Sequence, residues 1–175
     1  LVGTGVGGFF SYQGSSVSLS ADGNTAIVGG SGDDNSFGAT WVFSRSGGVW
    51  TQQGGKLVGT GTVGSAYQGV SVSLSADGNT AIEGGPFDNI SFGAAWVFTR
   101  SGSVWTQQGN KLVGSGAVGG SYQGYSVSLS RDGATAMVGG YGDDSFRGAG
   151  WVYTRDKPII GSISDIPHDQ GGSVH

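Results

Sequence analysis

One stretch of the chain recurs three times, and its spacing limits the fold more than any other feature. At an interval of 55 residues, the copies start at Tyr12, Tyr67 and Tyr122. In the first copy Val17 and Leu19 alternate with serines, which is the pattern of a β-strand with one buried face. An Asp-Gly turn follows, where glycine accepts a positive φ, and the chain returns along residues 25 to 28. Each copy therefore predicts a β-hairpin.

Two further strands follow each hairpin. In the first repeat they are predicted at residues 39 to 45 and from Val49 towards Val58, with a Gly-rich turn between them. Four short antiparallel strands in a tandem repeat of this length are typical of β-propeller blades. A parallel β-helix is the alternative, but its coils are usually shorter and lack the two tight turns. We therefore expect an all-β fold of four-stranded antiparallel blades that stack on one another.

Three blades are predicted within residues 1 to 155. A fourth-strand tail and linker (1–11) precedes blade 1 (12–58), blade 2 (67–113) and blade 3 (122–155). Blade 3 is expected to lack its fourth strand, because no Val-Trp-Thr-Gln-Gln follows Arg155, and residues 156 to 175 form a divergent tail. Propellers typically have about four to eight blades, so we expect an incomplete ring that needs more chain or a second copy. The start without Met or a signal peptide is interpreted as that of a processed or excised piece.

Three motifs of the second repeat match a known pattern. They are Tyr-Gln-Gly-Val-Ser-Val-Ser-Leu at 67–74, Ala-Ile-Glu-Gly-Gly-Pro at 81–86 and Gly-Ala-Ala-Trp-Val-Phe at 93–98. Together they resemble the FG-GAP repeat of integrin α-subunit propellers, and more closely its bacterial extracellular relatives. The resemblance covers residues 1 to 155 and implies an extracellular, secreted or cell-surface protein. The tail resembles the opening of a β-sandwich module that follows propellers in such secreted proteins.

The resemblance breaks at the turn of the hairpin. Family members that bind calcium carry Asp-x-Asp/Asn-x-Asp-Gly there, whereas this chain has Ala-Asp-Gly-Asn at residues 76 to 79. One carboxylate is too few for Ca²⁺, which takes about six to eight oxygen ligands. We therefore expect no calcium at this turn.

The loops that follow the hairpins carry the other candidate cation ligands. These are Asp33, Asp34, Asp88, Asp143 and Asp144. Because they recur at one position per blade, they are predicted to share one rim, as a weak cation site or a polar recognition surface. Turn chemistry is the favoured interpretation, since Asp side chains bond to their own backbone in loops. No cofactor is expected, and calcium is the alternative.

Two single residues are candidates for contacts with a partner. Glu83 stands where the other repeats have Val28 and Val138. An isolated buried carboxylate is costly, so Glu83 is expected to be exposed, near a central channel, or paired; a substitution without a function is the slightly favoured alternative. Asn89 begins an Asn-Ile-Ser glycosylation triplet, which matters only in a glycosylating secretory pathway.

Large side chains recur at fixed positions, which favours packing over ligand binding. Tryptophans that repeat in this way contribute most between blades, not as a sugar-stacking surface, and the repeated tyrosines are given the same role. These tryptophans are Trp41, Trp50, Trp96, Trp105 and Trp151. The arginines at the end of the third strand are interpreted as structural: Arg45, Arg100 and Arg155.

Composition excludes several function classes. Only 11% of residues are charged, the net charge is −4 and no run of Lys or Arg occurs, which weighs against nucleic acid and anionic membrane surfaces. The chain has no Cys, and so no disulfide or thiolate chemistry. No apolar window is long enough to span a membrane. The only histidines, His168 and His175, lie in the tail, and no catalytic set occurs in a repeat, so no enzyme is predicted.

The sequence therefore predicts a non-enzymatic extracellular module with a structural, adhesive or protein-interaction function. Its partners are expected to be other protein chains or further blades of the same chain. Unpaired edge strands at both ends predict strand addition, and with it a homo-oligomer or a filament. The alternative function is binding of carbohydrate or a divalent cation through the acidic loops.

Overall fold

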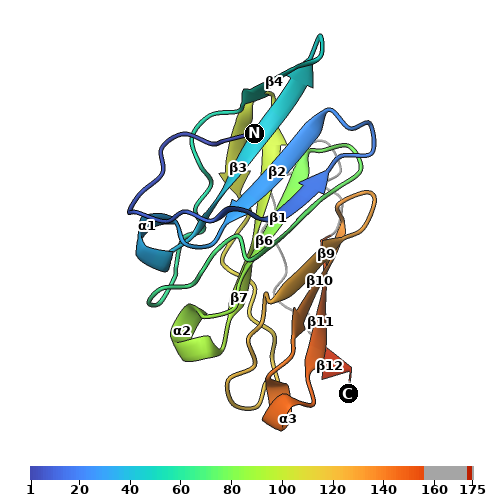
Figure 1. The fold of residues 1–175 in the computed structure, drawn as a ribbon. Coiled ribbons are helices and arrows are strands. Elements are labelled where there is room, and N and C mark those ends of the chain that lie inside the picture. The colour runs from blue at the N-terminus through green and yellow to red at the C-terminus, as the bar shows by residue number, and fades with distance from the viewer. Residues whose placement is uncertain (156–172, 175) are drawn as a thin grey trace.

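The computed structural model describes residues 1–155 and 173–174, and it is an all-β structure of antiparallel sheets (Figure 1). The first sheet contains β1 (Gln13–Leu19), β2 (Thr25–Gly30), β3 (Ala39–Ser46) and β4 (Val49–Gln52). The second contains β5 (Ser71–Leu74), β6 (Thr80–Gly85), β7 (Ala94–Ser101) and β8 (Val104–Gln107). The third contains β9 (Ser126–Leu129), β10 (Thr135–Gly140), β11 (Ala149–Thr154) and β12 (Ser173–Val174).

Each sheet has its strands in chain order or the exact reverse, which is the meander of a propeller blade. The predicted all-β fold of tandem four-stranded blades is thereby confirmed. The three sheets follow one another down the molecule (Figure 1), and over the described residues they do not close a ring. No helix of the described chain is long and apolar enough to cross a membrane.

Part of the core lies between consecutive blades, and a further cluster that includes Trp41 and Phe43 lies within the first blade. Ile27 and Val42 of the first blade pack against Leu74 and Ala81 of the second. The second interface repeats this arrangement, with Ile82, Ala95, Ala136 and Val138 in one cluster. Burial of this apolar surface is the main favourable term in stacking, because one sheet alone leaves both faces exposed.

The serines of the hairpin explain how the first strands join. The Leu74 N–H donates to Ser18 Oγ (3.1 Å), and the Leu129 N–H donates to Ser73 Oγ (3.1 Å). In strands with alternating Ser and Val or Leu, one face therefore carries apolar groups towards the preceding blade. The other face carries hydroxyls that bond to the backbone of the following blade. Both faces of an inner blade are used.

Glycine is required where a loop of one blade touches the next. Gly38 and Gly93 have φ of +81° and +78°, and a Cβ at either would lie 2.2 Å from a Gln68 or Gln123 carbonyl oxygen. Any side chain at these two positions would strain the backbone and block the contact. Part of the high Gly content is thus a packing requirement between blades.

Three of the five tryptophans are core residues, as predicted, but the cluster around Trp41 lies within its own blade and not between blades. Trp41, Trp96 and Trp151 are fully buried, and each indole N–H donates to a backbone carbonyl, at Thr4, Thr60 and Ser115. Trp50 and Trp105 are half-buried, and the guanidinium groups of Arg45 and Arg100 lie 5.6 and 5.5 Å from their ring centroids. These arginines therefore cover tryptophan faces, which supports their structural interpretation.

The fourth position of the third sheet is filled by the two residues of β12. Val174 pairs with Gly150, the register that Leu57 has with Thr40 in the first blade and Leu112 with Ala95 in the second. Blade 3, expected to lack a fourth strand, thus has two residues from the tail at this place. The predicted β-sandwich opening falls largely on residues 156–172, outside the described residues.

Candidate functional site

The acidic loops fold as three compact turns, each with a buried carboxylate at its start. They are α1 (Asp33–Ser36), α2 (Asp88–Ser91) and α3 (Asp143–Phe146). Asp33, Asp88 and Asp143 are at most 1% exposed. Their Oδ1 atoms accept backbone N–H groups from the segment that leads into the same blade: Gly7 (2.8 Å), Val63 (2.7 Å) and Val118 (2.7 Å). These carboxylates therefore fasten the connecting segment to the loop.

The third loop differs from the first two in the partner of the second carboxylate oxygen, Oδ2. Lys56 Nζ donates to Asp33 Oδ2, and Lys111 Nζ donates to Asp88 Oδ2, so both pairs are ion pairs. Asp143 Oδ2 is buried, and none of the described residues donates a hydrogen bond to it. Lys56 and Lys111 each lie 23 positions after their Asp, whereas the residue 23 positions after Asp143 is Ile166.

The neighbouring loop residues point outward. Asp34, Asn89 and Asp144 have left-handed φ of 47°, 48° and 44°, a conformation that Asn and Asp tolerate best among non-Gly residues. Asp34 and Asn89 are exposed, and Asp144 makes an exposed ion pair with Arg147 (2.9 Å). The loops of different blades do not pool their carboxylates: among the described residues no group of three or more His, Cys, Asp or Glu could hold a metal.

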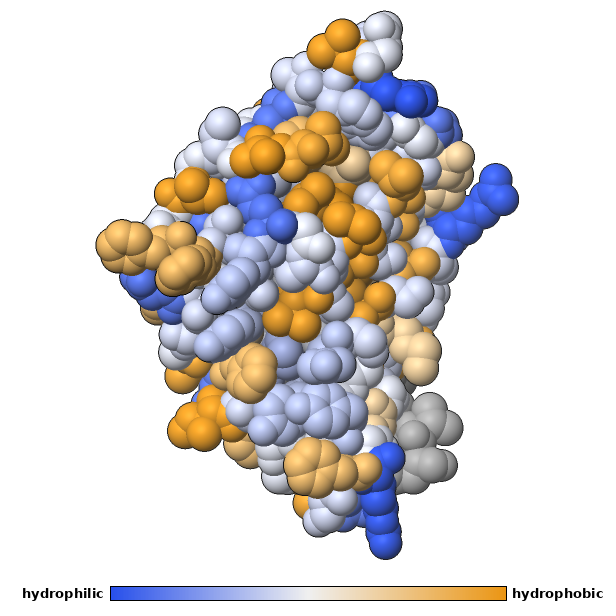
Figure 2. All heavy atoms as spheres, viewed as in Figure 1, coloured by the Kyte–Doolittle hydropathy of each residue, from blue (hydrophilic) through white to orange (hydrophobic). Residues whose placement is uncertain are grey.

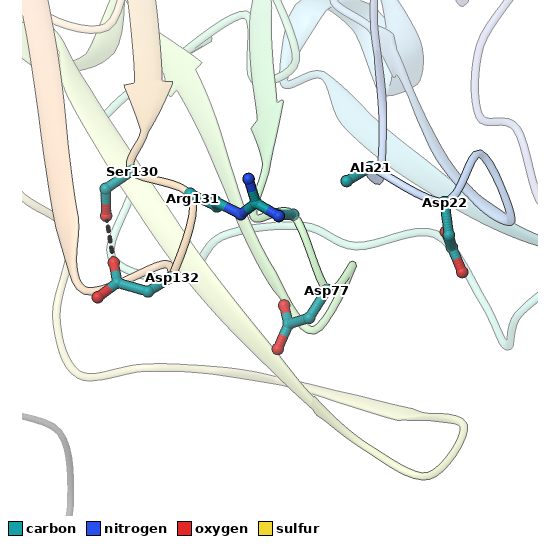
Figure 3. Close-up of a pocket in the computed structure, with 7 residues that line it drawn as sticks. Ala21, Asp22, Asp77, Ser130, Arg131 and Asp132 are labelled. Carbon is teal, nitrogen blue, oxygen red and sulfur yellow. Dashed lines mark hydrogen bonds between the residues drawn. The ribbon is translucent and has the colours of Figure 1, made fainter.

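The hairpin turns line an open pocket of about 840 Å³. Its lining comes from all three blades and comprises Ala21, Asp22, Ala76, Asp77, Ser130, Arg131 and Asp132. Figure 3 shows Asp22, Asp77 and Asp132 in a row, one from each turn. The turns are joined by backbone hydrogen bonds from Ala21 N to the Ala76 carbonyl and from Ala76 N to the Arg131 carbonyl (both 2.9 Å).

The turn carboxylates are satisfied within their own turns. Asp22 accepts from Ser20 Oγ (2.6 Å) and from the Asn24 N–H (2.9 Å), and these bonds lower its pKa to about 2. At Asp77 burial alone would raise the pKa, but bonds from Ser75 and Asn79 outweigh it and the pKa is lowered. Each carboxylate thus closes an Asx-type turn.

Glu83 lies inside the interface between blades 1 and 2. Its side chain is fully buried, and in the part of the chain that the structure describes neither carboxylate oxygen has a hydrogen-bond partner of good geometry. The hydroxyl of Thr40, on the facing blade, is also buried without a partner. Burial raises the Glu83 pKa to about 8, an effect that Thr40 and the Gly59 backbone only partly oppose. Glu83 is therefore not available as a surface contact, because the facing blade covers it.

The two outer blades expose faces that are buried in the inner positions. On the first blade Val17 is 68% and Leu19 60% exposed, whereas Leu74, the equivalent of Leu19, is 7% exposed. On the third blade Met137 is 52% exposed, whereas the equivalent Ile27 and Ile82 are 1% and 0% exposed. Figure 2 shows apolar side chains gathered on the face that carries the first hairpin. The ends of the stack are thus sheet faces, not unpaired strand edges.

A row of aromatic rings runs along the loop rim from blade to blade. The ring centroids of Tyr67 and Phe87 are 4.8 Å apart, those of Phe87 and Tyr122 5.6 Å, and those of Tyr122 and Tyr141 5.0 Å. Tyr67 and Tyr122 are half-buried, and Tyr122 bridges blades 2 and 3 through its contact with Phe87, whereas the Tyr67 ring packs on Phe87 of its own blade. Tyr12 is 63% exposed because no loop of another blade covers it here.

Two features were missed by reasoning from the sequence. The Asp–Lys pairs follow from a Lys at a constant 23 residues after the buried Asp, a signal visible in the first two repeats. The second is Thr40, the polar residue that faces Glu83. It stands out in the sequence because the equivalent residues of the other repeats are Ala95 and Gly150. Both signals appear only when all three repeats are compared position by position.

No known protein family matches the chain, and no curated protein is similar to it in sequence. Solved structures are similar in fold. Sqt1 of Saccharomyces cerevisiae is 15% identical over 95% of this chain and 37% of its own length, with a TM-score of 0.55. The hydrazine synthase of Kuenenia stuttgartiensis is 14% identical over 88% of this chain and 36% of its own, with a TM-score of 0.49.

The periplasmic gluconolactonase PpgL of Pseudomonas aeruginosa is 18% identical over 81% of this chain and 39% of its own length, with a TM-score of 0.49. The chain therefore spans little more than a third of each of these proteins. At this identity the similarity shows the fold alone, and that fold is propeller-like.

Proposed function

We propose that the chain is a non-enzymatic protein-interaction module that binds a second copy of itself through the outer faces of blades 1 and 3. The observation that carries the proposal is the match between the two exposed faces. The face around Met137 is the counterpart of the Ile27 and Ile82 faces, and each of those is covered by the first strand of the next blade. In this chain the matching uncovered first strand is β1, with Val17 and Leu19.

Polar groups at the two faces match in the same way. Ser18 and Ser73 receive an N–H from the next blade, so the equivalent Ser128 is placed to receive the Leu19 N–H of a second copy. Face packing of this kind buries apolar side chains and satisfies backbone groups together, which favours a defined register. A head-to-tail contact of two three-blade chains gives a six-blade ring if it closes and a filament if it does not.

We further propose that the module is an extracellular, secreted or cell-surface relative of FG-GAP repeats. The three motifs at 67–74, 81–86 and 93–98 support this kinship, and they fall on β5, β6 and β7 of one blade. Binding of carbohydrate or a cation through the acidic loops has less support. Asp33 and Asp88 already hold lysine ammonium groups, which a cation would have to displace.

The mass of the particle in solution tests the assembly. We expect light scattering to give a multiple of the 17.5 kDa chain at micromolar concentration. Met137→Glu places a charge in the contact and is expected to give a monomer. Val104→Glu is the matched control, because Val104 is 64% exposed on β8, away from both faces. A monomeric wild-type chain, or an unchanged mass in Met137→Glu, would refute self-association through these faces.

A further inference from the structure

The loop of blade 3 contains a buried carboxylate, Asp143, in which only one of the two oxygens accepts a hydrogen bond from a described residue. Asp143 is 1% exposed, and Oδ1 accepts the Val118 N–H at 2.7 Å, as in the other two blades. Within residues 1–155 and 173–174, no donor reaches Oδ2. A buried carboxylate oxygen without a partner is costly, and a lysine fills this place in both sister repeats.

The missing lysine belongs to a particular strand register. Lys56 precedes Leu57, which pairs with Thr40, and Lys111 precedes Leu112, which pairs with Ala95. In the third blade Val174 stands at the leucine position and Ser173 at the lysine position. Serine is too short to carry an ammonium group into the loop. The backbone of β12 therefore occupies the strand position, but no described residue brings a positive charge to Asp143 Oδ2.

We propose that blade 3 is a strand-addition site for a segment from another polypeptide that carries Lys-Leu-Val, with Asp143 as the receptor for the lysine ammonium. The inference rests on the proposed function as an interaction module and names the chemistry of one partner. The incoming segment replaces β12, pairs its leucine with Gly150 and directs its lysine to Asp143 Oδ2. Backbone hydrogen bonds supply affinity, and the Lys–Asp pair selects the segment and sets its register.

The two-residue length of β12 makes this exchange feasible. It forms two register pairs with β11, Gly150–Val174 and Trp151–Ser173. In the second blade, β8 forms four register pairs with β7, and Leu112, which follows β8, forms a further pair with Ala95. A segment with the β8 sequence therefore gains more backbone hydrogen bonds than it displaces.

The test uses a fluorescent peptide with the sequence of residues 104–114, Val-Trp-Thr-Gln-Gln-Gly-Asn-Lys-Leu-Val-Gly, and the full chain. We expect saturable one-to-one binding by fluorescence anisotropy. Lys111→Met in the peptide should weaken binding at least tenfold. Amide NMR should show the Val118 N–H shifting with the lysine peptide, while the Val63 N–H of the second blade does not shift.

Variants of the protein test whether the peptide lysine binds at Asp143. Asp143→Asn should weaken the lysine peptide at least tenfold and leave the methionine peptide unchanged, whereas Asp144→Asn, with the same change of charge in the same loop, should bind as wild type. If Asp143→Asn does not fold, the two peptides still decide the question on the wild-type chain. Equal binding of both peptides, or no binding by either, overturns the proposal. It leaves self-association untouched, since Met137→Glu tests that separately.

Discussion

Glu83 and Thr40 face each other where the neighbouring interface carries Val138 and Ala95. At the residue scale the chain has thus replaced an apolar pair by an acid and a hydroxyl in one of two equivalent interfaces. With its pKa raised to about 8, Glu83 is protonated at neutral pH and can donate to Thr40 Oγ1. A neutral acid costs far less to bury than a carboxylate.

The first residue-scale prediction is that this acid makes stability depend on pH. The pKa of Glu83 is about 8 in the folded chain against an ordinary 4.5, so the folded state holds the proton over that window. Its contribution to stability is complete below pH 4.5, decreases as pH rises and is lost above about 8. Within the window the slope is about 1.4 kcal/mol per pH unit. No charged side chain contributes to this shift: its causes are burial, Thr40 and the Gly59 backbone.

Urea unfolding of wild type and Glu83→Gln between pH 5 and 8 measures this slope. Glutamine keeps a hydrogen-bond donor towards Thr40 but does not titrate, so the free-energy difference between the two proteins should change steadily with pH. The double variant Thr40→Ala/Glu83→Val rebuilds the apolar pair and serves as the control without an acid. A difference that stays constant across this range would contradict a proton held at Glu83.

A second prediction at this scale concerns the Asp88–Lys111 pair. Lys111→Met leaves Asp88 buried and its Oδ2 without a donor, so we expect a loss of about 3 kcal/mol in the free energy of unfolding. Asp88→Asn/Lys111→Met removes both charges and should recover part of that loss. Chemical denaturation of the three proteins measures this loss and its recovery. Equal stability of wild type and Lys111→Met would show that the pair contributes nothing.

At the scale of elements, the strands were predicted well and the loops were not. Alternation of Val and Leu with Ser, Asp-Gly turns and recurring tryptophans suffice to predict the hairpins and the third strand. The turns α1 to α3 escaped prediction because they rest on successive left-handed residues, such as Asp34 and Asn35, which no simple pattern marks. The candidate Asp ligands were assigned to the right loops, but alternation cannot say which of two adjacent aspartates is buried.

Asp33 and Asp88 form ion pairs with lysines that lie 23 residues later in the chain. Such pairing is tertiary information, and a local reading of loop composition lacks it. The same holds for Glu83, because Thr40, the residue that it faces, lies on another blade. The repeats help here. A residue that differs from those at the equivalent positions of the other repeats indicates that a residue it contacts differs as well.

At the scale of the whole molecule, the stack has two different ends that fit one another. Its inner interfaces combine apolar side chains, serine hydroxyls and backbone hydrogen bonds, and both ends expose one half of this set. A monomer would leave Val17, Leu19 and Met137 in water, and a head-to-tail contact removes them from it. Because only 11% of all residues are charged, association is expected to depend weakly on salt.

The last prediction uses the absence of Cys to distinguish a ring from a filament. Ala76 N donates to the Arg131 carbonyl within one chain, so Arg131 of one copy should stand against Ala21 of the next. In Ala21→Cys/Arg131→Cys, mild oxidation is expected to join copies by disulfides. A six-blade ring of two chains gives dimers alone on a non-reducing gel, and a filament gives a ladder. Ala21→Cys/Ala76→Cys is the matched control, because Ala21 N donates to the Ala76 carbonyl and the bond forms inside one chain. If only the control variant forms a disulfide, the two end faces do not meet in solution.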